Sequence, residues 1–251
     1  YNGFEDYRGG GHFSGRITAA ITAAGAIAIS ALRSKGIVIG THIKSIHGVS
    51  DRDFSSLSED INNLNKKEFA VLDDNAKESM INAIETARND NDSVGGVLET
   101  AVVGLPVGVG EPWFDTVEGV LSHAVFSIPA VKGIEFGAGF KFAEMTGSEA
   151  NDEFEIKDNK VVTRTNNNAG INGGITNGMP VVFKTVIKPT PTISKPQATV
   201  DFLKKQNTEI CAGGRHDPCI VHRARVVIDS VTALALCDLL AVKFGTDWLA
   251  K

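Results

Sequence analysis

The chain has 251 residues, of which 42% are hydrophobic and 22% charged, enough to bury a full core. The net charge of -5 and the pI of about 5.7 argue against nucleic acid or an anionic membrane as the main partner. Three cysteines, not spaced as a disulfide framework, indicate a reducing compartment and a cytoplasmic protein. The apolar runs are broken by Lys, Arg or Gly before they reach membrane-spanning length.

The first part of the chain predicts a helix, a strand, a polar stretch and a second helix. An alanine-rich helix is expected over residues 16–34 and is ended by Gly36. Apolar residues alternate over 37–44, the period of a strand. Residues 51–73 are polar and predict surface. The helix expected over 74–88 carries an apolar face of Met80, Ile81, Ile84 and Ala87.

The middle of the chain predicts strand, helix and strand in turn. Residues 94–103 form an apolar run typical of a strand, and a second strand is expected over 132–142. Between them a helix is expected to open at Pro112. Its core stripe comprises Trp113, Phe114, Val117, Val120, Leu121, Ala124 and Val125.

The last part predicts a hairpin over 154–164 around Asp158-Asn159, a strand over 181–187 and a long apolar helix over 225–244. The chain is therefore expected to be a mixed α and β protein and a single domain, 1–251. Residues 51–91 are expected to be a polar and helical surface segment within that domain.

Residues 213–219, Gly-Gly-Arg-His-Asp-Pro-Cys, place a cation, an imidazole and a carboxylate side by side. Pro218 favours an extended backbone at Asp217, so the polar side chains fan out from a turn. Such a cluster can bind an anion and move protons. The alternative is that Asp217 caps a helix that begins at Pro218.

Residues 8–16, Arg-Gly-Gly-Gly-His-Phe-Ser-Gly-Arg, run into the first predicted helix. The free N–H groups and the positive dipole end of a helix N-terminus form an anion site. Arg8, His12 and Arg16 add charge or donors there. The alternative is a flexible loop with Ser14 as the helix cap.

Two further blocks carry turn chemistry. Residues 166–180 are rich in Asn and Gly, which tolerate left-handed backbone, and predict an ordered, tightly folded turn rather than a disordered linker. In 188–193, Lys-Pro-Thr-Pro-Thr-Ile, two prolines stiffen the end of a strand beside a lysine and two hydroxyls. The alternative for this block is an ordinary loop.

Taken together, the blocks resemble the chorismate synthase family. The resemblance covers nearly the whole chain except 51–91 and the tail after 245. The segments that carry it, in the family's order, are RGGGHFSGR, TAAITAAGAIA, GLPVGVGEPWFD, SIPAVKGIEFGAGF, NNNAGINGGITNG, KPTPTI and GRHDPC.

The resemblance implies an α+β fold with helices sandwiched between antiparallel β-sheets, and a homotetramer. The family, in the shikimate pathway, converts 5-enolpyruvylshikimate 3-phosphate to chorismate by a 1,4-trans elimination of phosphate with loss of hydrogen from C6. The reaction consumes no net redox equivalents but needs FMN in its reduced form. Whether NADP or an outside reductant reduces the flavin stays open.

The resemblance also implies site residues. A catalytic role falls to Asp217 with Arg215, Asp217 helping the flavin to accept the C6 proton. Arg16 and Arg215 are expected to hold the substrate phosphate or a carboxylate, which a guanidinium fork suits. No metal is expected. FMN contacts are implied at His12, Phe13, Ser14, Pro129, Ala130, Gly173, Lys188, Pro189, Thr190, Pro191, Thr192 and Arg215.

The sequence departs from the family in several places. The family's Gly-Glu-Ser-His-Gly and Arg-Pro-Gly-His-Ala-Asp motifs, each with a histidine used as an acid, have no counterpart here. We therefore expect the chain to correspond to the C-terminal part of the enzyme and to have little turnover alone. His12 and Ile21 stand where the family commonly has Arg, and 222–225 departs from the usual Pro-Arg-Ala-Val.

Three other interpretations stay open. The chain could bind FMN or phosphate without turnover. It could serve as an assembly module through the helix at 112–126 and the last helix. A zinc site is the third, but the spacing of its ligands fits no standard finger; they would be Cys211, His216, Cys219 and His222.

Overall fold

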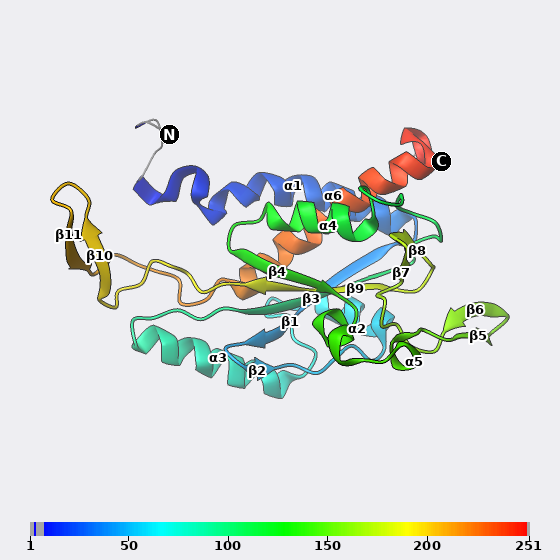
Figure 1. The fold of residues 1–251 in the computed structure, drawn as a ribbon, viewed down its shortest axis with the longest axis horizontal. Helices are drawn as coiled ribbons and strands as arrows, with labels where there is room; N and C mark the ends of the chain where they lie inside the picture. The colour runs from blue at the N-terminus through cyan, green and yellow to red at the C-terminus, as the bar shows by residue number, and fades with distance from the viewer. Residues whose placement is uncertain (1–2, 4–7, 250–251) are drawn as a thin grey trace.

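A five-stranded antiparallel sheet forms the centre of the fold (Figure 1). The protein is seen in a computed structural model that describes residues 3 and 8–249. The strand order is β2-β1-β3-β9-β4, and every neighbouring pair is antiparallel. The strands are β1 (Val38–Ile46), β2 (Val49–Ser50), β3 (Gly96–Val103), β4 (Val131–Phe136) and β9 (Val181–Ile187).

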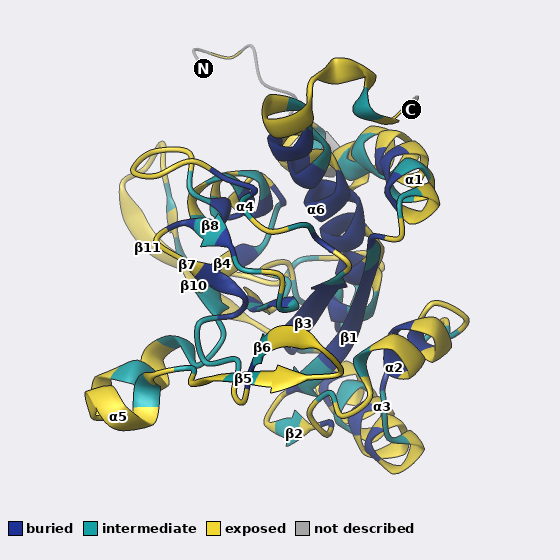
Figure 2. Ribbon diagram, turned by 90° about the vertical axis from the view of Figure 1, so that its right-hand side faces the viewer, coloured by how far each residue is buried: buried dark blue, intermediate teal, exposed yellow. Residues whose placement is uncertain are grey.

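Helices cover both faces of this sheet (Figure 2). One face carries α1 (Thr18–Ser34), α4 (Val117–Phe126) and α6 (Val221–Phe244), and the other carries α2 (Leu57–Leu64) and α3 (Asp74–Asn89). The expected α+β class, with helices and antiparallel sheets, is confirmed. The sequence resemblance implied helices between two sheets; within residues 8–249, the layer of α1, α4 and α6 packs against one large sheet, and the other sheets have two strands each. The short helical segments are η1 (Arg8–Phe13), η2 (Gly15–Ile17), η3 (Gly139–Glu144), α5 (Gly147–Ala150) and η4 (Thr246–Leu249).

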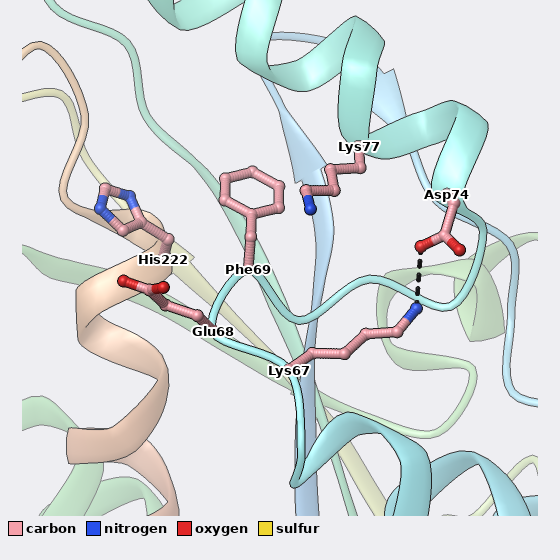
Figure 3. Close-up of a pocket in the computed structure, with 6 residues that line it drawn as sticks. All are labelled: Lys67, Glu68, Phe69, Asp74, Lys77 and His222. Atoms are coloured by element: carbon pink, nitrogen blue, oxygen red, sulfur yellow. Dashed lines mark hydrogen bonds and ion pairs between the residues drawn. The ribbon is translucent and has the colours of Figure 1, made fainter.

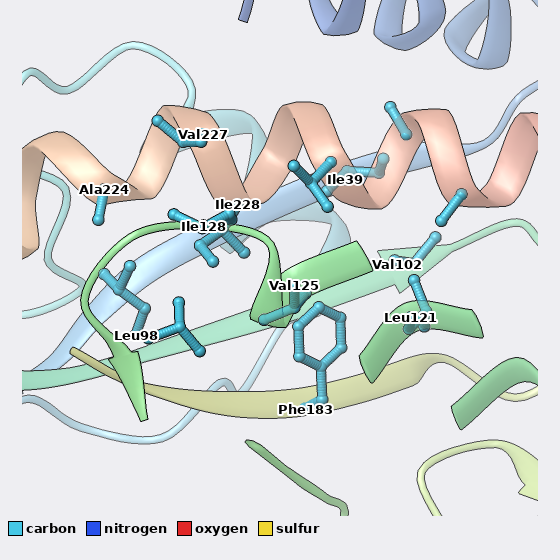
Figure 4. Close-up of a cluster of buried hydrophobic side chains, with 14 of the residues drawn as sticks. Ile39, Leu98, Val102, Leu121, Val125, Ile128, Phe183, Ala224, Val227 and Ile228 are labelled. Atoms are coloured by element: carbon cyan, nitrogen blue, oxygen red, sulfur yellow. The ribbon is translucent and has the colours of Figure 1, made fainter. Parts of the chain in front are cut away.

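The main core lies between the sheet and α6 (Figure 4). Leu98 and Val102 of β3 and Phe183 of β9 meet Leu121 and Val125 of α4 beneath α6, and all five are buried. The predicted central position of the last helix is confirmed, because most of α6 is buried. By length and composition the helical stretch Gly15–Ser34 could cross a membrane, so the expectation that the apolar runs fall short of membrane-spanning length is wrong here; this stretch is 22% buried, and core helices and signal sequences pass the same test.

Three hairpins leave the body of the sheet. The predicted hairpin is formed by β5 (Phe154–Lys157) and β6 (Lys160–Thr163), and its turn residues Asp158 and Asn159 have φ of 51° and 60°, as a type I′ turn requires. The Asn- and Gly-rich block folds into β7 (Ile171–Asn172) and β8 (Ile175–Thr176), so the predicted ordered turn is confirmed. The hairpin of β10 (Gln197–Asp201) and β11 (Gln206–Ile210) was not predicted.

The helix expected to open at Pro112 begins five residues later. Trp113 has a left-handed φ of 78°, which no α-helix accommodates. Thr116 is the N-cap, and its hydroxyl accepts the N–H of Gly119. Trp113 and Phe114 are 85% and 88% exposed, so their assignment to the core was wrong, whereas the rest of the stripe is buried or half-buried.

Two other predictions need correction. The strand expected to reach residue 142 ends at Phe136, because Gly137 and Gly139 take left-handed backbone and turn the chain into η3. Residues 51–73 are not a simple polar surface, because they include α2 and the buried carboxylates of Asp51 and Asp60. Both carboxylates are buried with a basic partner, which makes their burial tolerable.

Candidate functional site

A cavity of about 420 Å³ lies at the N-terminal end of α6. Its walls are the end of α3, the chain at 192–194, the turn at 214–219 and the first turn of α6. Three of the residues predicted from sequence, Thr192, Arg215 and Asp217, line it together. They come from two segments that the β10–β11 hairpin separates in the chain.

Asp217 is held by an ion pair and not by a helix cap. The guanidinium of Arg223, in the first turn of α6, donates to Oδ2 of Asp217 at 2.8 Å. The helix begins at Val221, and its N-cap residue Ile220 makes no side-chain cap. The alternative in which Asp217 caps a helix from Pro218 is therefore wrong. The carbonyl of Pro218 instead accepts the N–H of Val94 at 2.8 Å, which fixes the turn beside β3.

The run from Lys188 to Thr192 joins two other predicted segments. The N–H of Lys188 donates to the carbonyl of Ala130 at 2.9 Å, so Pro129 and Ala130 lie next to this run. The hydroxyl of Ser93 donates to the carbonyl of Thr190 at 2.7 Å. The hydroxyl of Thr190 itself is buried without a hydrogen-bond partner among the described residues. An unpaired buried hydroxyl of this kind calls for a ligand or water; Pro189 and Pro191 are exposed beside it.

The segment around His12 lies at the start of α1. The Ser14 hydroxyl accepts the N–H of Arg16 at 3.2 Å and caps the short η2, whereas α1 itself begins after Ile17, which makes no side-chain cap. His12, Phe13 and Arg16 are exposed. Among the residues that the structure describes, no hydrogen bond or ion pair joins the side chains of His12 or Arg16 to the cavity. Their roles stay predictions.

Gly173 lies apart from the other predicted contacts. It occupies the exposed turn between β7 and β8 with φ of 59°. The carbonyl of the next residue, Gly174, accepts the N–H of Val117 at the start of α4, whereas Ala130 follows the end of that helix. A helix of ten residues is about 15 Å long. The structure therefore separates Gly173 from Ala130 by the length of α4.

The cavity also contains residues that sequence reasoning missed. Arg88, Asn91 and Asp92 come from the end of α3, and Arg223 and His222 come from α6. The sequence feature that could have indicated the first three is the run Arg88-Asn89-Asp90-Asn91-Asp92 at the end of a predicted helix. Charged residues in this part of the chain were interpreted as solvent-exposed. Arg223 lies six residues after Asp217, and this spacing does not predict an ion pair unless it is known that α6 begins between the two residues.

The charges around the cavity leave one cation available. Three arginines and three carboxylates line it, but Arg88 pairs with Glu85 and Arg223 with Asp217, so Arg215 is the guanidinium without an ion-pair partner among the described residues. The N-terminus of α6 adds the positive end of a helix dipole. No three His, Cys, Asp or Glu side chains within residues 8–249 are grouped so that they could hold a metal ion. The fold and the cavity define an α+β protein with a cavity at a helix N-terminus that is lined by arginines and carboxylates.

The comparisons with known proteins identify the family. The model of the family described as "Chorismate synthase" matches residues 1–241, and the chain belongs to this family. A chorismate synthase of Pyrococcus abyssi is 48% identical over all of this chain and 69% of its own length. Those of Korarchaeum cryptofilum and Dehalococcoides mccartyi are 44% and 45% identical, each over 95% of this chain and 66% and 65% of their own lengths.

A solved structure gives the same result for the fold. A crystal structure of chorismate synthase superimposes with a TM-score of 0.78 at 30% identity, over 93% of this chain and 66% of that one. The chain thus spans about two thirds of the length of most of these relatives. The resemblance seen in the sequence motifs is confirmed.

Proposed function

We propose that the protein acts as a chorismate synthase, a carbon–oxygen lyase that eliminates phosphate from 5-enolpyruvylshikimate 3-phosphate to give chorismate. The observation that carries the proposal is the family match over residues 1–241. The cavity that gathers Thr192, Arg215 and Asp217 supports it independently. The chain spans 69% and 66% of the lengths of two of these relatives. We therefore propose, rather than infer from the family alone, that it has the activity of the whole enzyme.

The residues around the cavity fit the flavin and phosphate chemistry that the family implies. The buried Thr190 hydroxyl has no partner among the described residues and can donate to a ligand oxygen. Lys188 is half-buried beside it, and Arg215 is exposed at the cavity wall. We place reduced FMN along this run, from Ala130 to Arg215. When bound, it would supply electron density to the substrate as phosphate leaves.

The chain's own residues would bind and orient the substrate. Arg215, which has no ion-pair partner among the described residues, would hold the substrate phosphate by charge-assisted hydrogen bonds at the N-terminal end of α6. Asp217 would assist the transfer of the proton lost from C6 to the flavin, and the ion pair with Arg223 orients its carboxylate. Arg223 is then a positioning residue in this scheme, because it reaches the substrate through Asp217.

The proposal extends to the assembly and the compartment. A cytoplasmic homotetramer without a nucleic-acid or membrane partner fits the acidic charge and the unpaired cysteines of the chain. Light scattering coupled to size-exclusion chromatography measures the assembly directly. A monomer at all concentrations would contradict that part of the proposal and leave the cavity unaffected.

An anaerobic titration with reduced FMN and 5-enolpyruvylshikimate 3-phosphate tests the function. We expect a saturable change in flavin absorbance, and Arg215→Gln should weaken binding by roughly 10- to 100-fold, the effect of one lost charge-assisted hydrogen bond. The matched control is Arg33→Gln, at the exposed end of α1 and outside the cavity. Equal affinities of the two variants, or no saturable change, would contradict the proposed site.

Phosphate release and chorismate formation, measured in the same samples, separate the two candidate functions. Both products in equal amounts support the synthase. Flavin binding without either product favours the alternative of an FMN-binding module without turnover. The observation behind that alternative is that the chain spans about two thirds of the length of most of the relatives it matches.

A further inference from the structure

A second cavity, of about 440 Å³, lies on the other side of His222 from the first. It is formed by the loop between α2 and α3, the start of α3 and the first turn of α6. Cavities of this size hold small molecules. Figure 3 shows the six residues that line it: Lys67, Glu68, Phe69, Asp74, Lys77 and His222.

The cavity has an aromatic wall that is anchored in the fold. Phe69 is half-buried and packs against the main core. Its ring stacks on the imidazole of His222 at 6.0 Å with 25° between the planes. Burial, with the nearby charge of Arg223, lowers the pKa of His222, so this ring is neutral near pH 7. Phe69, with a neutral imidazole against one face, therefore offers an uncharged aromatic surface on which a third ring can stack.

The positive charge of the cavity is concentrated at one end. The Nζ of Lys67 donates to the Val71 carbonyl and to Oδ1 of Asp74, both at 3.0 Å, so this amine is held in place. The side-chain amine of Lys77 has no hydrogen bond or ion pair within residues 8–249 and is free to bind an anion. Glu68 lies near His222, and Lys77 lies on the other side of Phe69 (Figure 3).

The balance of charges limits the ligand class. Two lysines and two carboxylates line the cavity, and because Lys67 already pairs with Asp74, one amine is left for a ligand, which matches one negative charge better than two. A single carboxylate is matched by Lys77, with Lys67 nearby. The aromatic wall adds a preference for a flat ring. The unpaired carboxylate of Glu68 disfavours the reversed orientation, in which the ligand's negative charge would face it.

We propose that this cavity binds a small aromatic carboxylate, with its ring against Phe69 and its carboxylate at Lys77. The site is distinct from the proposed catalytic cavity, but His222 lines both. A ligand on Phe69 contacts the same α6 turn that carries Arg223 and, through it, Asp217. A ligand bound in the second cavity would therefore affect the position of Arg223 and Asp217 in the first.

An NMR titration of the uniformly ¹⁵N-labelled protein with benzoate tests the proposal. A ligand of this size is expected to bind with a Kd of about 1 mM. Saturable shifts should map to residues 67–77 and to the first turn of α6. Lys77→Gln and Phe69→Leu should each weaken binding by about fivefold, and cyclohexanecarboxylate, which has the charge without the aromatic face, should bind more weakly than benzoate.

The matched control is Lys66→Gln, which removes the same charge from a neighbouring exposed residue that does not line the cavity. Its affinity for benzoate should equal that of the parent. Equal weakening by Lys66→Gln and Lys77→Gln would mean nonspecific attraction and would overturn the proposal. So would shifts that do not saturate by about 20-fold above the expected Kd, or that map outside the cavity. The backbone spectrum of each variant reports whether it is folded.

Discussion

Replacement of Asp51 by asparagine tests the buried ionic centre, the cluster of His42, Asp51 and Glu99, which joins the sheet to the chain between α2 and α3. His42 is fully buried on β1, with Nδ1 2.8 Å from Oδ2 of Asp51 and Nε2 2.8 Å from Oε2 of Glu99. Asp51 also accepts the N–H groups of Leu72 and Asp73 at 2.6 and 2.9 Å. One carboxylate therefore holds both the imidazole of the sheet and the chain that leads into α3.

The expected cost follows from this geometry. Burial alone would lower the pKa of His42, but the hydrogen bonds to Asp51 and Glu99 outweigh burial and raise it. With a carboxylate oxygen 2.8 Å from each ring nitrogen, the protonated ring can donate from both. The amide introduced by Asp51→Asn keeps an acceptor but removes one of the two countercharges. Loss of one partner from a buried ion pair costs about 3–5 kcal/mol, a large part of a total stability of about 5–15 kcal/mol. For a chain of this length that is roughly 6–20 °C in Tm.

Urea unfolding followed by circular dichroism at pH 7 measures the difference. The control is Asp53→Asn, which removes the same charge two residues away, where the side chain is 83% exposed and pairs with Lys44. An exposed pair contributes about 0–1 kcal/mol. If Asp51→Asn loses no more stability than Asp53→Asn, the buried ionic centre does not stabilise the fold and the reasoning fails.

Three further outcomes are expected. The stability that His42 contributes is present below its ordinary pKa of 6.5 and is lost as pH rises through the raised folded pKa, so unfolding free energy should fall above pH 6.5, and less steeply in Asp51→Asn. Burial raises the pKa of Asp229 to about 6, so the folded state should lose stability as pH rises from about 4 to 6, and pH-jump denaturation of Asp229→Asn should show that slope removed. Gly25→Ala places a Cβ 2.2 Å from that of Ser230 and should cost about 1–3 kcal/mol by thermal unfolding, whereas Gly15→Ala, with open space around it, should be nearly neutral.

The parts of the fold that local sequence specifies were predicted well. The turn at Asp158-Asn159 needs two residues that accept left-handed backbone, and both do so. The helix at 74–88 follows from the spacing of its apolar residues, of which Met80 and Ala87 are buried. In each case residues within one or two turns of each other decide the conformation, so no tertiary partner has to be known.

The parts that depend on distant partners were missed. Asp51 and Asp60 were predicted to be surface residues, because their burial depends on the ion pairs with His42 and Arg52, which the sequence does not reveal. The β10–β11 hairpin has an exposed Phe202-Leu203 at its turn and no alternation that leads to a core, so it carries little hydrophobic signal. Trp113 shows the reverse error, because its apolar ring fits a helical stripe that its left-handed backbone does not allow.

The candidate site shows the same division. The motifs predicted Thr192, Arg215 and Asp217, and the structure brings these into one cavity. Arg88 lines the same cavity from the last turn of α3, and no local sequence pattern predicts that α3 ends beside the turn at 214–219. Gly173 was grouped with these residues by motif alone, and the length of α4 now separates it from Ala130.

The position of both cavities depends on how α6 is fixed to the sheet. Asp229 accepts the hydroxyl of Thr41 at 2.6 Å, and Thr41 in turn lies 2.7 Å from the hydroxyl of Thr100 on β3. Arg225, also buried, donates to the Thr41 carbonyl at 3.0 Å and to Asn65 at 2.8 Å. These contacts fix α6 along its axis and in rotation, because a buried polar group that shifts by one residue loses its partners. The first turn of the helix, which carries His222 and Arg223, is thus held by polar contacts one to two turns further along. A rigid helix can position the groups on it to within about 0.5 Å. The hydrogen bond from Thr41 thus fixes α6 while it offsets part of the cost of burying the Asp229 carboxylate, whose pKa burial raises to about 6.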